Sequence, residues 1–298
     1  MQRFRFITLL LTALFCGLPC IAYSYDLQIV AIDNTDTTKH IIEDLRKRIP
    51  SAQLLTDPSK YPKNKNSIYL TIGPAALRAM LAQGFVDGVI ISSFTSSQVV
   101  HSILEAAPES HKTAITAIYA EPSPVIQMRL ISMLYKKTPN VAVILSSKTA
   151  YLESIYQNAA TQTHTELTIE KLVDGDNLNH VLNRLSDVLV ILAIPDSNVF
   201  NQDSFRNILI TSYRRNQSVI GFSTSFVKAG ALASSYSSIE DIDAQVDELI
   251  TTFTSTGKLP DPQFPKYFST LINEDVARSL NIVVSDSVKK FSRKPGGG

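Results

Sequence analysis

The stretch that decides the fold is SVIGFSTSFVKAGALASSYSS, residues 218–238, continued beyond an amphipathic segment by TGKLPDPQFPKYFSTLINEDVARSLNI, residues 256–282. An apolar strand over 218–222 ends in a Gly/Ser/Thr turn, and a second short strand over 231–235 leads into a helix. A Gly-Lys-Leu-Pro turn follows, then an edge strand interrupted by prolines and a last short helix. This order predicts an α/β fold.

Upstream of this stretch, apolar strands alternate with amphipathic helices, and a helix is expected to open at Gly73-Pro74. Strands are expected at 27–32, 67–72, 89–92, 113–119, 141–145, 167–173 and 188–193. Further helices are expected at 36–48, 96–107, 124–137, 151–161, 177–185 and 203–216. Such alternation favours parallel sheets covered on both faces. One strand–helix series ends and another begins near 119–124, which predicts two α/β lobes.

Taken together, these segments resemble ABC-transporter substrate-binding proteins of the periplasmic-binding-protein type I class. More narrowly, they are similar to the branch whose ligands include tryptophan and tyrosine. Val227 and Gly230-Ala231-Leu232-Ala233-Ser234 match the family's crossover between strand and helix, and Ile272-Asn273, Ala277 and Leu280-Asn281-Ile282 match its closing motif. The resemblance covers essentially the whole mature chain, is strongest from Thr113 onward and is weakest before Ser67.

The resemblance implies a two-lobed type I fold in which each lobe is a parallel sheet flanked by helices. Three segments near Tyr119, Ala233 and Phe264 would form the hinge. The N-terminal lobe would comprise residues 25–119 and 234–263, and the C-terminal lobe residues 120–233 and 264–288. Residues 289–298 are polar and end in Pro-Gly-Gly-Gly, which is typical of a flexible tail.

Residues 1–24 have the pattern of a cleaved signal peptide. Arg3 and Arg5 precede an apolar run over 6–18, and the small residues Ala22 and Ser24 stand at positions −3 and −1 of a cleavage point after Ser24. A membrane anchor is disfavoured because a bilayer needs about 20 apolar residues. Lipidation at Cys16 or Cys20 is disfavoured because neither follows a small residue, and the mature chain would contain no cysteine. We therefore expect a periplasmic protein.

Composition and motifs argue against several classes of function. The chain has 28 basic and 27 acidic residues, and loss of Arg3 and Arg5 leaves 26 against 27. The excess of basic residues that is typical of nucleic-acid-binding proteins is therefore absent from the sequence. Glycine-rich phosphate motifs are absent and the five histidines have no metal spacing, so no cofactor or metal is predicted. Gly221-Phe222-Ser223-Thr224-Ser225 is similar to a nucleophile elbow but lacks its final glycine, which favours a polar turn over a catalytic one.

Candidate ligand-binding residues follow the carboxyl ends of the expected strands, where ligands bind in open parallel sheets. They are Gly73, Ser92, Ser93, Phe94, Tyr119, Glu121, Ser147, Asp196, Ser223 and Thr224. Helix N-termini at several of these points favour an anionic group such as a carboxylate. Ser and Thr at such points serve equally well as helix caps.

Asp196 carries the most specific of these expectations. Asp196-Ser197-Asn198-Val199 partly matches an Asp-Asn-Thr-Val sequence of the family, which implies an acid that pairs with a ligand's ammonium group. The alternative is an N-cap for the following helix. Phe94, Tyr119 and Phe222 are aromatic side chains that can stack on a flat ligand, with core packing favoured for Phe222. The family's usual Asp-Pro pair is missing at 93–97.

The expected function is that of an extracytoplasmic solute-binding protein of an ABC importer. It would bind a small ligand, an amino acid or similar zwitterion, in the interlobe cleft by hinge closure, and would act as a monomer with an ABC permease. Two alternatives remain open from the sequence. One is a ligand-sensing protein of the same fold that acts with a receptor or sensor kinase, and the other is an α/β enzyme of the envelope.

Overall fold

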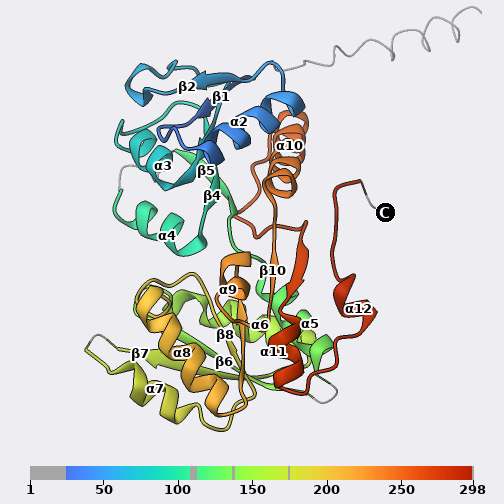
Figure 1. The fold of residues 1–298 in the computed structure, drawn as a ribbon. Coiled ribbons are helices and arrows are strands. Elements are labelled where there is room, and N and C mark those ends of the chain that lie inside the picture. The colour runs from blue at the N-terminus through green and yellow to red at the C-terminus, as the bar shows by residue number, and fades with distance from the viewer. Residues whose placement is uncertain (1–24, 108–112, 136–137, 174, 297–298) are drawn as a thin grey trace, which may run out of the picture.

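The computed structural model describes residues 25–107, 113–135, 138–173 and 175–296. The expected signal peptide, residues 1–24, lies outside them. The described chain forms two α/β lobes, one above the other in Figure 1, that are joined by three segments. Within these ranges, we find no helix with the length and apolar character needed to span a bilayer.

The N-terminal lobe is built on a five-stranded sheet with the order β2-β1-β3-β4-β5, in which every pairing is parallel. Its strands are β1 (Asp26–Val30), β2 (Gln53–Leu55), β3 (Ser67–Ile72), β4 (Val89–Thr95) and β5 (Ala114–Tyr119). Helices α2 (Asp36–Arg48) and α10 (Ile239–Thr256) pack on one face, whereas α3 (Gly73–Leu81) and α4 (Ser97–Glu105) pack on the other. A short 3-10 turn, η2, lies at Pro58–Lys60.

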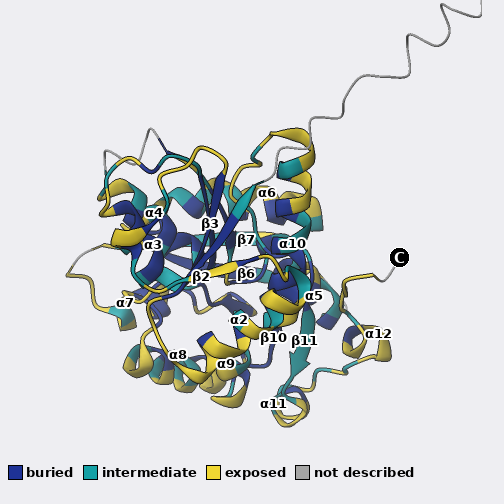
Figure 2. Ribbon diagram, turned by 90° about the horizontal axis from the view of Figure 1, so that it is seen from above, coloured by how far each residue is buried: buried dark blue, intermediate teal, exposed yellow. Residues whose placement is uncertain are grey.

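The C-terminal lobe contains a six-stranded sheet with the order β11-β10-β9-β8-β6-β7. The strands are β6 (Asn140–Ser146), β7 (Glu166–Leu172), β8 (Val190–Leu192), β9 (Ser218–Gly221), β10 (Ala233–Tyr236) and β11 (Ser269–Ile272), of which β11 alone pairs antiparallel. The helical segments are α5 (Pro124–Leu134), η4 (Ala150–Leu152), α6 (Glu153–Thr163), α7 (Leu178–Arg184), α8 (Gln202–Arg214), α9 (Thr224–Lys228), α11 (Glu274–Ser279) and α12 (Asp286–Lys289). In Figure 2 the strands are largely buried and the outer helix faces exposed.

The local sequence explains why these elements form. Thr35 caps α2 by accepting the N–H of Thr38 at 3.1 Å, and its last turn ends in Arg46, Lys47 and Arg48, as the helix dipole favours. All six residues of β3 are buried, as expected for a strand covered on both faces. The predicted fold class, two lobes of parallel sheet flanked by helices, is confirmed.

The second crossover lies later than the sequence predicts. Residues 233–236 form β10, which pairs with β9 and β11, so this strand belongs to the C-terminal lobe rather than beginning the return to the other lobe. The return begins with α10 at Ile239. The third crossover spans 264–268, between Gln263, which pairs with Ile118, and β11. Most residues of β10 are small and buried, so the sequence has no amphipathic pattern here that would locate the boundary between the strand and the crossover.

Two further expectations differ from the structure. Residues 289–296 have specific partners, since Arg293 and Phe268 form a backbone bridge, whereas the sequence predicts a flexible tail. A five-residue helix, α9, directly follows the Ser223 turn, where the sequence predicts passage to a strand. In both places the structure depends on contacts with distant segments, which a local composition does not reveal.

Candidate ligand-binding site

The two lobes touch through a pair of stacked rings. His101 of α4, in the N-terminal lobe, lies against Tyr151 of η4, in the C-terminal lobe, with ring centroids 4.1 Å apart and planes at 28°. His101 is held from its own helix by Glu105, whose carboxylate is 3.1 Å from the imidazole Nε2. The facing surfaces of the lobes therefore meet at α4 and at the segment that follows β6.

Two buried hydroxyl groups lie near each other beside this contact. The hydroxyls of Ser97 and Tyr151 are both shielded from solvent, and neither makes a well-formed hydrogen bond to any described group. Burial raises the pKa of Tyr151 to about 12, an effect that the nearby Ser97 hydroxyl partly offsets. Glu121, Tyr119 and Asp196 lie close enough to Tyr151 for their charges to raise this pKa further. Polar groups from both lobes thus converge on one place.

Glu121 brings a buried carboxylate to this place from the first crossover. Its two oxygens accept the backbone N–H of Ser97 at 2.9 and 3.1 Å, so the acid caps the N-terminus of α4. Burial raises the pKa of Glu121, and the hydrogen bonds from Ser97 oppose that rise. The amides and dipole of a helix N-terminus favour a negative group, so this acid is held in a defined position between the lobes.

Tyr119 lies in the hinge itself. Its ring packs edge-on against Phe264 of the third crossover, with centroids 5.0 Å apart, and its backbone N–H donates to the carbonyl of Gln263 at 3.0 Å. Burial raises the pKa of its hydroxyl to about 12, with a smaller contribution from Glu121. Two of the three crossovers are therefore joined beside the interlobe contact.

Asp196 is buried and fully engaged within the C-terminal lobe. One carboxylate oxygen accepts the Thr149 hydroxyl at 2.6 Å and the Ser146 N–H at 3.1 Å, and the other accepts the Asn198 N–H at 3.0 Å. The next helix, α8, is capped by Asn201, whereas Asp196 caps the short turn at 197–199 through the Asn198 N–H. Asp196 joins the turn after β6 to the turn after β8.

The remaining predicted site residues occupy varied positions. Phe94 has a left-handed backbone (φ 56°) at an irregularity in the β4–β5 register, and its ring packs with the core cluster beneath α2 and α10. Ser92 and Ser93 are fully buried in β4, and the Ser93 hydroxyl donates to the carbonyl of Thr71 at 3.4 Å. Gly73, with φ +76°, is the first residue of α3.

Three predicted residues of the C-terminal lobe lie at strand ends. Ser147 is exposed after β6, and Ser223 and Thr224 begin α9, where the Ser223 and Ser225 hydroxyls are 2.7 Å apart. The described contacts connect none of these three with Tyr151. The structure thus brings Tyr119 and Glu121 together, with Asp196 near Tyr151, and leaves Phe94 against the core.

Ser97, His101 and Tyr151 were missed by reasoning from the sequence. Each lies a few residues beyond a strand end that was selected, Ser97 and His101 after β4 and Tyr151 after β6. A rule that extends each strand end to the first turn of the next helix would have included Ser97 and Tyr151. Among the described residues, no group of three or more His, Cys, Asp or Glu side chains could hold a metal ion.

Comparison with known proteins gives a match of structure and not of sequence. Neither a family model nor a curated protein matches the chain. A ligand-free, open substrate-binding protein with adhesive properties from Clostridium difficile superposes with a TM-score of 0.60 at 12% identity, over 88% of this chain and 97% of that one. This chain has the type I periplasmic-binding-protein fold.

Two other solved structures support the same fold. A conserved domain protein from Vibrio cholerae gives a TM-score of 0.55 at 16% identity, over 89% of this chain and 97% of that one. An ABC protein domain from Streptococcus pneumonia in complex with L-Trp gives 0.54 at 12% identity, over 90% and 98%. The resemblance seen in the sequence is confirmed at the level of the fold.

Proposed function

We propose that this protein is an extracytoplasmic solute-binding protein of an ABC importer, which binds a small ligand between its lobes and closes around it at the hinge. The observation that carries the proposal is the pair of buried hydroxyls of Ser97 and Tyr151, one from each lobe, which lie near each other beside the carboxylate of Glu121. A ligand that forms hydrogen bonds with both hydroxyls would bridge the two lobes and favour closure.

The groups at this place suit a small zwitterion, and we infer an amino acid with an aromatic or apolar side chain. Glu121 would accept a charge-assisted hydrogen bond from the ligand's ammonium, the role that the sequence assigns to Asp196. The hydroxyls of Ser97 and Tyr151 would donate to its carboxylate. The rings of Tyr119, Tyr151 and His101 offer stacking surfaces for a flat side chain. The streptococcal structure with L-Trp shows that this fold accommodates such a ligand.

Asp196 has a supporting role in this proposal. By fixing Thr149 and Ser146, it would hold the segment that presents Tyr151. Gly73, Ser147, Ser223 and Thr224 remain candidate contacts of the closed form, because they lie at the strand ends of the two sheets. Ser92 and Ser93 are buried within β4 and are not included. We also propose that the protein acts as a monomer in the periplasm and that its partner is a membrane permease.

A thermal-shift screen of the twenty amino acids tests the proposal. A ligand present at 100 times its dissociation constant stabilises the folded state by about 2.7 kcal/mol, which raises the melting temperature measurably. We expect one or a few aromatic or apolar amino acids to raise it and acidic ones to leave it unchanged. If acidic or sugar ligands alone raise it, the amino-acid assignment is wrong and a solute-binding role survives. If no small solute raises it, the solute-binding role is wrong.

A further inference from the structure

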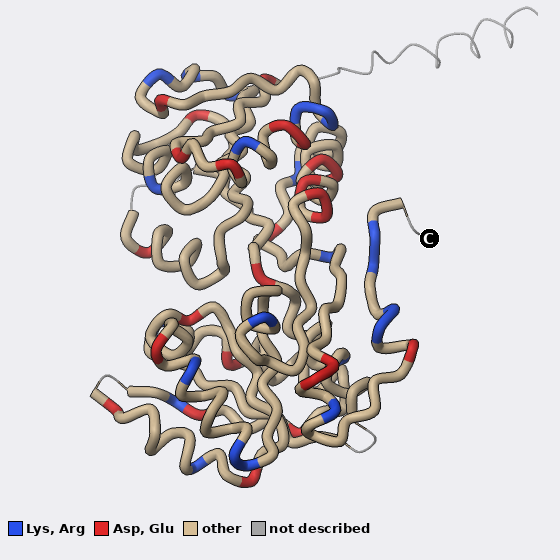
Figure 3. The backbone as a smooth tube through the Cα atoms, in the orientation of Figure 1, with Lys and Arg blue, Asp and Glu red and all other residues tan. Residues whose placement is uncertain are grey.

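The C-terminal residues 290–296, which we call the tail, run along the hinge. In Figure 1 the tail leaves α12 in the C-terminal lobe and rises beside the crossovers toward the lower end of α10. Figure 3 shows that this segment carries basic residues while the nearby start of α10 is acidic. The tail therefore connects the two lobes by a path separate from the three covalent crossovers.

One part of the tail is fixed to the C-terminal lobe. The backbones of Phe268 and Arg293 exchange two hydrogen bonds, both 2.9 Å, and the Thr270 hydroxyl of β11 donates to the Phe291 carbonyl at 2.6 Å. The rings of Phe268 and Phe291 meet edge-on with centroids 4.9 Å apart. Because Phe268 is only 4% exposed, this attachment combines backbone pairing with apolar burial.

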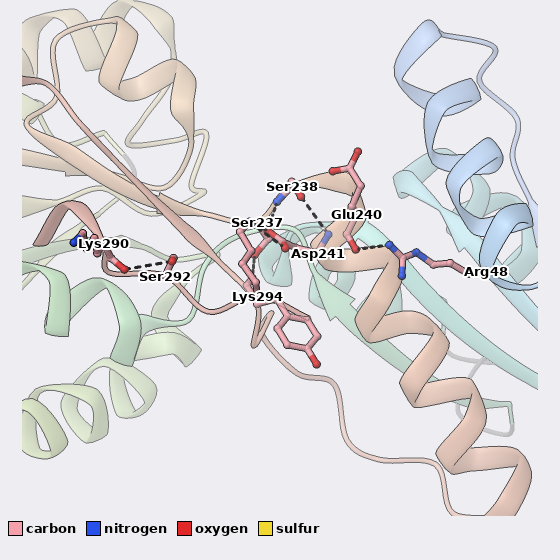
Figure 4. Close-up of polar contacts among 9 residues, drawn as sticks. Arg48, Ser237, Ser238, Glu240, Asp241, Lys290, Ser292 and Lys294 are labelled. Atoms are coloured by element: carbon pink, nitrogen blue, oxygen red, sulfur yellow. Dashed lines mark hydrogen bonds and ion pairs between the residues drawn. The ribbon is translucent and has the colours of Figure 1, made fainter. Parts of the chain in front are cut away.

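The next residue of the tail reaches the other lobe. The Lys294 ammonium donates to both carboxylate oxygens of Asp241, at 3.0 and 3.3 Å (Figure 4). Asp241 is 2% exposed and lies in the first turn of α10, where it also accepts the Ser238 N–H at 3.1 Å. Within the described chain, Lys294 is the cation that pairs with this acid.

The first turns of α10 are packed into the N-terminal lobe. Ile242 and Val246 of this helix belong to the core cluster that includes Ile29 and Leu70 of the first sheet. Glu240 is also tied to α2, since its carboxylate lies 3.0 Å from the His40 imidazole and its carbonyl accepts from Arg48 at 3.4 Å. Asp241 is therefore connected through α10 to the sheet and to α2 of the N-terminal lobe.

We propose that the tail is a latch, a fourth and non-covalent connection that holds the hinge at the angle seen here. Rotation of the lobes changes the separation between α10 and β11, and the tail joins these two elements through Lys294 at one end and Phe291 and Arg293 at the other. When the lobes open or close, either the Lys294–Asp241 ion pair must break or the tail must move with the N-terminal lobe and detach from β11. Loss of Lys294 would leave a buried carboxylate without its cation, which is costly. The latch needs no ligand, so it stands or fails independently of the proposed function.

The test is the distribution of distances between the lobes, measured by pulsed electron–electron resonance on spin labels. Cysteines replace Ala82 and Asn158, which are exposed on opposite lobes, and Cys16 and Cys20 are replaced by serine. The variants are Lys294→Ala and Asp241→Asn, the latter because asparagine keeps an oxygen to accept the Ser238 N–H. Lys290→Ala is the matched control, since it removes an exposed lysine of the same tail that makes no described ion pair.

We expect Lys294→Ala and Asp241→Asn to shift or broaden the distribution in the same way. The double variant should add nothing further, because the two residues act through one contact. Lys290→Ala should match the unsubstituted protein. The latch is ruled out if Lys294→Ala leaves the distribution unchanged. It is also ruled out if Lys290→Ala changes it as much, because the effect would then reflect tail charge in general.

Discussion

The backbone N–H of Ser97 donates to both carboxylate oxygens of Glu121, at 2.9 and 3.1 Å. This contact joins the first crossover to the N-terminus of α4, the helix whose His101 stacks on Tyr151 of the opposite lobe. The first crossover is therefore linked, through hydrogen bonds to α4, to the helix that makes the interlobe contact.

Replacement of Glu121 by alanine should destabilise the protein. The Ser97 N–H would lose its acceptor in a buried position, which costs about 1–3 kcal/mol. Glu121→Gln keeps an acceptor oxygen and should cost less. Urea denaturation at pH 7 measures both free energies of unfolding. Equal stability of Glu121→Ala and the unsubstituted protein would show that solvent replaces the carboxylate freely.

Asp196→Ala should reduce both stability and ligand affinity. The Thr149 hydroxyl and the Ser146 N–H would lose a buried acceptor, so we expect a loss of about 1–3 kcal/mol in the free energy of unfolding. Because the affected turn presents Tyr151, ligand binding should weaken by at least tenfold. Ser197→Ala, on the exposed neighbour, is the control. Unchanged melting temperature in Asp196→Ala would mean that its hydrogen bonds contribute nothing measurable.

Asp243 predicts an unusual dependence of stability on pH. It is fully buried in α10, and its carboxyl group lies beside that of Asp44, with which it can share a proton in a hydrogen bond. Burial, followed by the like charge of Asp44 in α2, raises its pKa to about 8, although Arg48 opposes the rise and Glu240 adds to it. The folded protein therefore keeps this proton where the unfolded chain, with a pKa of 3.8, has lost it.

The free energy of unfolding should consequently fall as pH rises from about 4 to about 8, by up to about 1.4 kcal/mol per pH unit from this group. Asp243→Asn should remove that slope and be more stable than the unsubstituted protein at pH 8. Denaturation curves across this range decide the matter. Asp261→Asn, at an exposed acid, serves as control. Parallel pH profiles for Asp243→Asn and the unsubstituted protein would refute the assignment.

The signal-peptide pattern of residues 1–24 predicts a mature N-terminus at Tyr25. Expression in a Gram-negative host and intact-mass measurement of the periplasmic fraction give the mature length directly. We expect the mass of residues 25–298 without modification. Retention of Met1, or a lipid adduct on Cys16 or Cys20, would be inconsistent with cleavage at this point.

Periodicity was sufficient for the regular elements and insufficient for β2. The predicted helix at 36–48 and strand at 67–72 coincide with α2 and β3, because both have strong apolar patterns and clear caps or turns. β2 has only three residues, two of them exposed, and thus no pattern to detect. The two-lobed fold was predicted from the break between two strand–helix series near 119–124, together with the family resemblance that the segments of residues 218–282 carry.

The candidate site was only partly predictable, because it depends on contacts between lobes. Strand ends indicate Tyr119 and Glu121, yet the meeting of His101 with Tyr151 follows from the lobe arrangement alone. Two of the three partners of the Asp196 carboxylate lie 47 and 50 residues away along the chain, so no local pattern reveals these contacts. The left-handed backbone of Phe94 and the packing of its ring against the core likewise leave no mark in a strand-like sequence.

The most direct test of ligand binding between the lobes is calorimetric titration of the best amino acid from the thermal-shift screen. The proteins compared are the unsubstituted chain, Glu121→Gln, Tyr151→Phe and the control Arg129→Ala, which changes an exposed side chain of α5. We predict one ligand per chain and an affinity at least tenfold lower in both interlobe variants, equivalent to about 1.4 kcal/mol. Arg129→Ala should bind normally. Unchanged affinity in both interlobe variants would contradict the account.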